Sequence, residues 1–532
     1  MLESAEKKLI EPFVTSLEAP VFGFTNLPSV VVGALFGRYS RSELGARELL
    51  AREFLANQDF TSAMGDLSAH KLTVDPAKAD AFFGRVLDQY GDDSVAELGG
   101  TAIAVENVSN VLAKYIEDRR IGLSPLEKSS RYVRFDVKDA RGHYPFFTDP
   151  DIAQAGLAKK YNEIMVALFD TYSEMIPLLM EHLKKRFPQG EGQSDKAYLN
   201  ALRAQACDVT RYLLPMATQT NVGLVGNGRA FEYLIYQLRS SKLAEARKYA
   251  DMISNALDQL IPAFIRRSKT ERGTGYVTHL SDMRNTMKTH SQAHFTHHYS
   301  GDQPTVRLID YDKVGEEKVT AGILYEHSNQ PFDAVLRHVI KNKKLIKTII
   351  EDTLTHRQHR THKPPRAFEH AYYQFEITCD IGAYRDLHRH RILTQQRQPF
   401  TTNLGYSTPS DIIEAGLADK YQKAMDDAAI LHQKIEVKLP EQAQYVVPFG
   451  YLIRFTMRLN AREAYHLCEL RSTIQGHPSY RLVAQEMARQ IAKVHPTLGK
   501  GMMITWDGYD ALARVDSEMK IEAKERLRKT GT

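Results

Sequence analysis

The sequence predicts an α+β protein made of two tandem copies of one domain, each a mixed sheet with helices. The first observation is internal similarity: "DIAQAGLAKKYNEIM" at 151–165 aligns without a gap with "DIIEAGLADKYQKAM" at 411–425. The second is that each half contains one strand-like alternation and several longer helical patterns. Self-similarity over this distance indicates a duplicated domain rather than two unrelated ones.

Other matched segments extend the duplication over most of the chain. They are Glu97-Leu98 with Glu369-His370 and Arg119 with Arg391, both at an offset of 272 residues, then "RYLLP" (211–215) with "QYVVP" (444–448), and "NGR" (227–229) with "NAR" (460–462). We therefore expect a first repeat at 1–275, a linker at 276–303 and a second repeat at 304–532.

The expected linker is polar and poor in apolar periodicity. It contains His290, His294, His297 and His298, but no cysteine or carboxylate set accompanies them at the spacing of familiar metal sites. We expect no metal there and none elsewhere in the chain.

Composition limits the class of protein. The 532 residues are 43% hydrophobic, and 70 Lys and Arg against 65 Asp and Glu give a net charge of only +5. This excess suits anionic small molecules, whereas a dedicated nucleic-acid binder is usually far more basic. Three scattered cysteines and the lack of a long apolar run favour a reducing cytoplasm and no membrane association.

The secondary structure around the most basic segment can be predicted element by element. Residues 373–379, "YQFEITC", alternate like a half-buried strand, and 101–108 are the weaker counterpart. Asp380 and Ser109 then offer side-chain oxygens as helix N-caps. The helix after Asp380 would end near Arg389, His390 and Arg391. Further helices are expected at 157–179 and 479–494.

Arginine is the main candidate for ligand binding because its planar fork of donors fits phosphate oxygens. Besides Arg389 and Arg391, candidates are Arg211, the segment "EKSSRY" (127–132) and the segment "NAREAYHLCELRS" (460–472). The sequence lacks a Walker-type loop, a GxGxxG motif and a recognisable Ser-His-Asp or Cys-His set. An enzyme with these residues would need a cofactor for the difficult chemistry.

Together these motifs resemble the flavin-dependent thymidylate synthases. That family carries a Glu-His pair, then Arg-His-Arg, Glu-x-Ser-x-Arg-Tyr, Arg-x-x-Leu-Pro, Asn-x-Arg and a further Arg, and nearly all pieces occur here in order. The resemblance implies FAD as cofactor, NADPH and methylenetetrahydrofolate as co-substrates, and dUMP as the substrate converted to dTMP. Family members are homotetramers, so the resemblance implies a homodimer of tandem chains that mimics a tetramer.

The resemblance also assigns residues. Arg471 would be catalytic by polarising the uracil ring. FAD would contact His370, Arg389, His390, Arg391, Glu127, Asn460, Arg462 and His466. The nucleotide would contact Glu127, Ser129, Ser130, Arg131, Arg211, Asp386, Arg389 and Arg471, with Arg131 and Arg211 at its phosphate.

Neither repeat carries the complete set. In the first repeat, Leu98 replaces the histidine of the Glu-His pair and "EDRR" (117–120) replaces Arg-His-Arg. In the second, Pro399, Thr401 and Gln444 stand where the family has Ser, Arg and Arg. Because the family divides its nucleotide pocket between two subunits in the same way, we expect one composite site per chain.

Two other functions are compatible with the sequence. The same scaffold could transfer a methyl or hydroxymethyl group to another pyrimidine nucleotide. Alternatively, the protein could be a non-catalytic nucleotide or RNA binder, a reading supported by the basic segments "KNKKLIK" and "HRQHRTHKPPR". Binding to long RNA would weaken steeply with salt.

Overall fold

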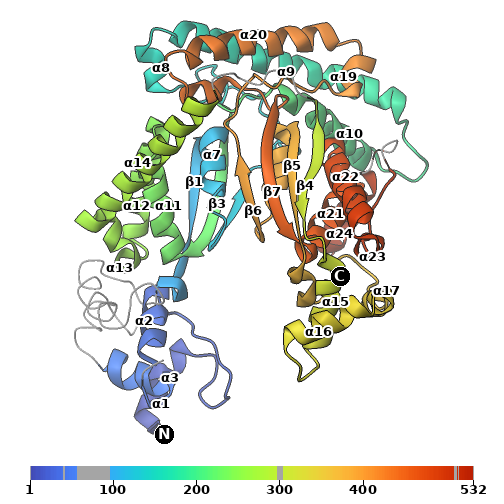
Figure 1. Ribbon diagram of the computed structural model, residues 1–532. Helices are drawn as coiled ribbons and strands as arrows, with labels where there is room; N and C mark the ends of the chain where they lie inside the picture. Colours follow the sequence, from blue (N-terminus) through green and yellow to red (C-terminus); the bar gives the residue numbers. More distant parts are fainter. Residues whose placement is uncertain are drawn as a thin grey trace. The chain divides into compact units, whose positions relative to one another are not determined.

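A computed structural model describes residues 2–39, 42–56, 96–295, 303–508, 512 and 514–530. The chain forms two compact units that are described separately (Figure 1). Unit 1 comprises Met1–Lys128 and Thr220–Thr296, and unit 2 comprises Ser129–Gln219 and His297–Thr532. Both units combine helices with a small sheet, so the predicted α+β class is confirmed.

Unit 1 is built on a three-stranded sheet in the order β1-β3-β2. Its strands are β1 (Gly100–Ser109), β2 (Leu123–Glu127) and β3 (Gln219–Asn227). Its α-helices are α1 (Ser4–Ile10), α2 (Ser29–Tyr39), α3 (Ala46–Leu49), α7 (Asn110–Glu117), α11 (Gly228–Arg239), α12 (Ala244–Asp258), α13 (Pro262–Ile265) and α14 (Glu271–His294).

Helix α14 includes most of the segment that the sequence marks as a linker, 276–303. Among the residues of α14, only Gly273 and Leu280 are buried, which explains why no apolar periodicity identifies this helix. Residues 296–302, with His297 and His298, lie outside the described residues. The boundary between the two repeats stays a prediction.

Unit 2 has a four-stranded sheet in the order β4-β5-β7-β6, in which all neighbours are antiparallel. The strands are β4 (Thr305–Tyr311), β5 (Tyr372–Asp380), β6 (Leu393–Arg397) and β7 (Leu452–Asn460). Strand β5 confirms the strand predicted at 373–379, and Tyr373, Phe375 and Ile377 are fully buried as the alternation requires.

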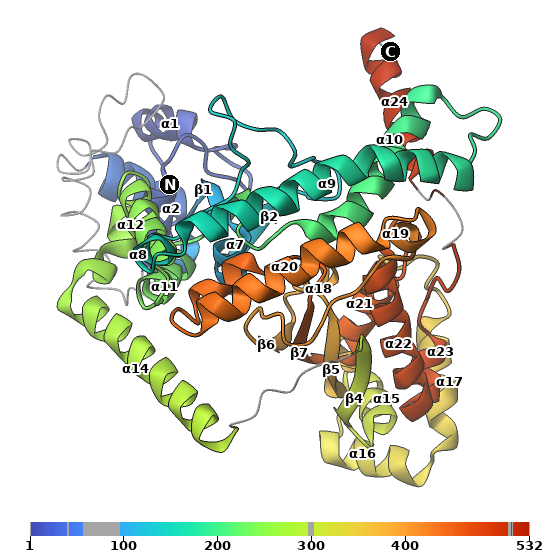
Figure 2. The ribbon, with the colours of Figure 1, turned by 90° about the horizontal axis from the view of Figure 1, so that it is seen from above.

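Helices surround this sheet, and their order repeats. Helices α8 (Pro150–Gln154) and α9 (Ala158–Arg186) correspond to α19 (Ser410–Glu414) and α20 (Ala418–Glu436), as the aligned segments predict. Helices α9 and α20 lie side by side in Figures 1 and 2 and pack together. The other helices are α10 (Asp195–Thr210), α15 (Gly315–Tyr325), α16 (Phe332–Lys341), α17 (Lys344–Leu354), α18 (Ile381–Leu387), α21 (Ala461–Arg471), α22 (Pro478–Val494), α23 (Pro496–Lys500) and α24 (Val515–Thr530).

Corresponding segments of the two repeats also pair directly within unit 2. The amides of Met216 and Ala217 donate to the carbonyls of Val447 and Tyr445, at 2.9 and 2.8 Å. In return, the amides of Phe449 and Gly450 donate to the carbonyls of Leu214 and Tyr212, at 3.0 and 2.9 Å. Each bond has a counterpart with the repeats exchanged, so this part of unit 2 has an internal twofold relation.

The helices of the described ranges include none with both the length and the apolar character that a membrane crossing requires.

Candidate functional site

The chain turns at the end of β5 to present the basic segment. The Asp380 carboxylate accepts a hydrogen bond from the Ala383 amide at 2.7 Å and caps α18, and Ser109 caps α7 through the Leu112 amide at 3.0 Å. Both predicted N-caps are confirmed. Because α18 ends at Leu387, Arg389, His390 and Arg391 follow in the turn that leads to β6.

Asp386 on α18 is the centre of an arginine cluster in unit 2. Its carboxylate is 4% exposed and lies 3.7 Å from Arg211 Nη1 and 3.6 Å from Arg389 Nη1. Burial by itself would raise the pKa of Asp386, but Arg389, Arg211 and the more distant Arg131 and Arg471 outweigh it and lower the pKa to about 2. Several guanidiniums therefore share this one buried carboxylate.

Arg131 joins the cluster through a second carboxylate. Its guanidinium donates to both oxygens of Asp208, at 2.8 and 2.9 Å, and to the Tyr480 hydroxyl at 2.9 Å. Asp208 also accepts from Arg514. Although burial opposes ionisation, Arg131 and Arg514 hold the pKa of Asp208 well below its usual range. The segment 129–219 of the first repeat thus contacts the second repeat inside unit 2.

Arg211 also comes from the first repeat. It is 2% exposed, and its Nη2 donates to the Gly382 carbonyl of α18 at 3.1 Å. Its Nε is buried, and no acceptor for it exists among the described residues. The Oδ2 atom of Asp386 is likewise buried without a hydrogen bond in that part of the chain. The two residues of the Arg211–Asp386 ion pair thus each keep one buried polar atom without a hydrogen bond: a donor on Arg211 and an acceptor on Asp386. Buried polar atoms without a partner are typical of ligand sites.

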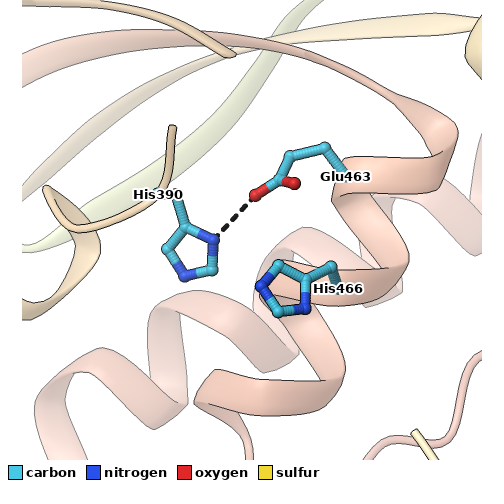
Figure 3. A group of neighbouring side chains, drawn as sticks. All are labelled: His390, Glu463 and His466. Carbon is cyan, nitrogen blue, oxygen red and sulfur yellow. Dashed lines mark hydrogen bonds and ion pairs between the residues drawn. The ribbon is translucent and has the colours of Figure 1, made fainter. Parts of the chain in front are cut away.

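The Arg-His-Arg histidine links two elements of the second repeat. His390 Nδ1 lies 2.7 Å from Glu463 Oε1, and His390 Nε2 accepts from Arg471 Nε at 3.0 Å (Figure 3 shows the Glu463 contact). The ring of His466 lies 5.3 Å from that of His390. Arginine has no acceptor, so Nε2 must carry the lone pair and Nδ1 the proton that is donated to Glu463.

The ligand atoms of His390, Glu463 and His466 lie within 4.8 Å of one another, which is compatible with a metal ion. However, Arg471 already occupies the Nε2 lone pair, and Lys363 and Arg462 add positive charge at Glu463. Three cations around one carboxylate disfavour a divalent ion. This set is better described as a hydrogen-bonded group.

A second set of His182, Asp411 and Glu414 also meets the distance criterion for a metal. Arg186 lies between its two carboxylates, 2.7 Å from Asp411 and 3.1 Å from Glu414. Because this guanidinium already pairs with both acids, the set is better described as an ion-pair network between α9 and α19.

The remaining flavin-side candidates lie near the start of α21. Asn460 caps this helix by accepting from the Glu463 amide at 2.9 Å. Arg462 donates to the Pro364 carbonyl at 2.8 Å and to Glu369 at 3.2 Å. The next residue, His370, is exposed and packs on the Phe332 ring at 4.9 Å. Arg391 is exposed as well.

The "EKSSRY" segment is divided between the units. Ser130 is buried and accepts from Arg385 Nη1 at 2.8 Å, and Ser129 Oγ accepts from the Arg131 amide at 3.3 Å, both in unit 2. Glu127 belongs to unit 1, where it is buried 2.9 Å from Lys114 Nζ. Of the nucleotide-side candidates, Ser130, Arg131 and Arg211 therefore meet the second repeat.

Five residues of the site were not singled out from the sequence: Asp208, Arg385, Glu463, Tyr480 and Arg514. Glu463 lies inside the motif segment, and Asp208 precedes Arg211 by three residues. An acid on a helix is ordinarily solvated, and only the tertiary contact with an arginine or histidine distinguishes these two.

A cavity of about 490 Å³ borders the cluster in unit 2. Both repeats line it, with Asp208 and Tyr212 from the first and Asp380, His477 and Ser479 from the second. Tyr212 and His477 stack with ring centroids 5.7 Å apart.

The sequence that forms these two repeats matches the same known family twice. The chain belongs to the family described as thymidylate synthase complementing protein, whose model matches residues 49–263 and 307–497. Two matches in one chain agree with the tandem repeat. Residues 57–95 of the first match lie outside the described residues.

Some relatives match over most of their own length and most of this chain, so both repeats are included in the match. A UPF0159 protein of Chlamydia muridarum is 40% identical over 495 residues, which cover 92% of this chain and 93% of that protein. A UPF0159 protein of Thermoplasma acidophilum is 32% identical over 518 residues, covering 92% and 98%. A flavin-dependent thymidylate synthase of Sulfolobus acidocaldarius is 30% identical over 204 residues, covering 37% of this chain and 75% of that enzyme.

Proposed function

We propose that the protein is an FAD-dependent thymidylate synthase-like enzyme with one composite site per tandem chain. It would convert dUMP to dTMP with methylenetetrahydrofolate and NADPH. One observation carries the proposal: Arg131 and Arg211, retained only by the first repeat, lie with Arg389 and Arg471 around Asp386 in a single compact unit. Family membership and the flavin-dependent relative support it.

The donor set suits a polyanionic cofactor such as FAD. The Arg389 side chain is 45% exposed, and Arg391 and His370 are also exposed, so cationic and imidazole donors reach the surface beside the buried cluster. Arg389, His390, Arg391, His370, Asn460, Arg462 and His466 would hold the cofactor. When bound, FAD would supply the redox chemistry that these side chains lack.

The chain's own residues would bind and polarise the nucleotide. Arg211 has an unused buried Nε donor for a phosphate oxygen, whereas Arg131 is already paired with Asp208 and would act through its charge. Arg471 would stabilise negative charge that develops on the pyrimidine ring. A fixed guanidinium stabilises such charge without reorganising when the charge develops.

Asp386 supports a second candidate, methyl or hydroxymethyl transfer to another pyrimidine nucleotide. Its buried Oδ2 is an unused acceptor among four guanidiniums and would favour a ligand that presents an N–H or O–H group. Uracil is one such ligand, and other pyrimidines with a ring N–H or an amino group are also suitable.

The quaternary structure proposed with this function is a homodimer. Two tandem chains contain four copies of the domain, which equals the number in a tetramer of single-domain subunits.

Purified protein should contain or take up flavin, and absorbance with a protein assay gives the stoichiometry. We expect one flavin per chain and dUMP-dependent oxidation of NADPH only with methylenetetrahydrofolate present. Product mass with several deoxynucleotides separates the two candidate substrates. Protein that cannot be loaded with FAD would contradict the proposal, and two flavins per chain would contradict the composite site.

A further inference from the structure

We propose that Glu463 is a positioning residue, which holds His390 in one tautomer and through it fixes the guanidinium of Arg471 toward the pyrimidine. The inference rests on the proposed function for the role of Arg471. The hydrogen-bonded series Glu463–His390–Arg471 is itself a property of the protein without ligands. We call these three residues the Glu-His-Arg relay.

His390 connects Glu463 with Arg471, which are too far apart on their helix to contact each other. Glu463 and Arg471 lie on the same helix, α21, eight residues apart, which places them roughly 12 Å apart along its axis. His390 comes from the turn after α18 and contacts both, at 2.7 Å through Nδ1 and 3.0 Å through Nε2. It is 3% exposed, and Glu463 is 6% exposed, so water does not substitute for either contact.

Only one protonation state of His390 satisfies both contacts. Arg471 Nε always donates, so Nε2 must accept. A doubly protonated ring would direct a second donor at Arg471, and the opposite tautomer would direct a lone pair at an ionised Glu463. An ionised Glu463 therefore selects the state that keeps Arg471 in place.

The contact leaves most of the Arg471 guanidinium for a ligand. Within the described part of the chain, His390 is its hydrogen-bond partner, and that bond uses Nε alone. Arg471 also lies over the Tyr480 ring at 5.7 Å and is attracted by Asp386. The donors on Nη1 and Nη2 are the ones that a pyrimidine oxygen would meet.

The carboxyl group of Glu463 is suited to change its protonation state near neutral pH. Burial raises its pKa to about 7, against the attraction of His466, Lys363, Arg462 and Arg471. His390 is the other titratable group in contact with it. Once protonated, Glu463 can donate to Nδ1 and select the other tautomer, which cannot accept from Arg471.

The test compares three proteins as full chains: wild type, Glu463→Gln and Glu463→Ala. Glutamine keeps an oxygen acceptor for Nδ1–H but does not titrate, whereas alanine removes the acceptor. The matched control is Glu469→Gln, a buried acid on the same helix that pairs with Arg357. Nitrogen-15 NMR of labelled histidines, without any ligand, reports the tautomer, and His390→Gln identifies the signals of His390.

We expect the Nδ1–H tautomer in wild type at pH 8, a change toward the other state at pH 6, and no such change in Glu463→Gln. Alanine should lose the preference at both pH values and lower kcat on the order of 10- to 100-fold with little change in KM. Glu469→Gln should behave like wild type in both measurements.

Failure of the Glu-His-Arg relay and failure of the proposed function give different results in these measurements. A His390 signal that is identical in wild type and Glu463→Ala overturns the relay, whether or not dTMP is made. If the tautomer of His390 still changes with pH in Glu463→Gln as it does in wild type, the relay is also overturned. This second test requires only that the conservative variant folds. A tautomer that follows Glu463 in a protein that makes no dTMP supports the relay and contradicts the proposed function alone.

Discussion

The helix that follows the first long strand carries an ion pair in both units, but with opposite signs. In unit 1, Lys114 on α7 pairs with Glu117 three residues later and with Glu127. In unit 2, Asp386 on α18 pairs with Arg389 three residues later and with Arg211. In each unit the residue at the centre is buried.

The difference lies in which charge is in excess. Lys114 is paired with two buried carboxylates, Glu117 and Glu127. Asp386 is outnumbered by guanidiniums that it cannot neutralise. The first arrangement is a closed ion-pair group, whereas the second has an excess of positive charge, which would favour an anionic ligand under the proposed function.

The arginines around Asp386 should give the largest effect on ligand binding when they are replaced. We expect Arg389→Ala and Arg131→Ala each to abolish measurable dUMP binding, because losing one partner of a charge contact that the bound nucleotide would bury costs on the order of 2–5 kcal/mol. Isothermal titration with dUMP measures this. Arg239→Ala, which removes contacts with Asp251 and Ser268 in unit 1, is the control and should bind normally. Loss of binding from changes in one repeat only would refute a composite site.

The sequence alone was sufficient for the duplication, strand β5, both N-caps and the position of Arg-His-Arg, because these depend on local patterns and internal similarity. It was also sufficient to propose that residues of the two repeats complement each other. It did not reveal that Arg131 is already engaged by Asp208, because that pair is separated by 77 residues and depends on tertiary contact.

The "EDRR" segment illustrates the same limit. The resemblance implies that a flavin contact is missing at Glu117, so its replacement should matter little for dUMP binding, which stays a prediction. In the structure Glu117 is buried against Lys114, so its replacement is expected to affect the stability of unit 1. The sequence shows that the family motif is absent at 117–120 but not the ion pair that Glu117 forms with Lys114.

Lys114→Met tests whether the ion pairs of unit 1 stabilise the fold. It leaves Glu117 and Glu127 buried without their cation, and breaking a buried ion pair in this way typically costs about 3–5 kcal/mol. We expect a lower midpoint in chemical unfolding, most clearly in a transition that reports unit 1. The triple change Lys114→Met, Glu117→Leu, Glu127→Met should recover much of that stability. A single variant as stable as wild type would show that the pair contributes nothing.

Asp386→Asn should have a smaller and pH-dependent effect. The pKa of Asp386 is lowered to about 2, so its ionised form contributes stability above the ordinary value of 3.8 that is lost as pH falls through about 2. A shift of this size corresponds to about 2 kcal/mol. Thermal unfolding should therefore show a destabilised variant at pH 7 and convergence with wild type near pH 2. The variant should also bind inorganic pyrophosphate more tightly than wild type does; weaker binding would mean that Asp386 organises the anion site rather than balancing it.

Glu463→Gln tests a carboxylate of the same unit whose pKa is shifted in the opposite direction from that of Asp386. Because burial raises the pKa of Glu463 from 4.5 to about 7, wild type loses stability as pH rises between these values, whereas glutamine does not titrate. We expect the stability of the variant relative to wild type to increase by roughly 1–3 kcal/mol between pH 4.5 and pH 8. Asp386 gives the reverse trend at far lower pH, so one set of unfolding curves from pH 2 to pH 8 distinguishes the two carboxylates. A pH-independent difference would mean that Glu463 is ionised throughout, and the tautomer of His390 would then be fixed at every pH at which the protein works.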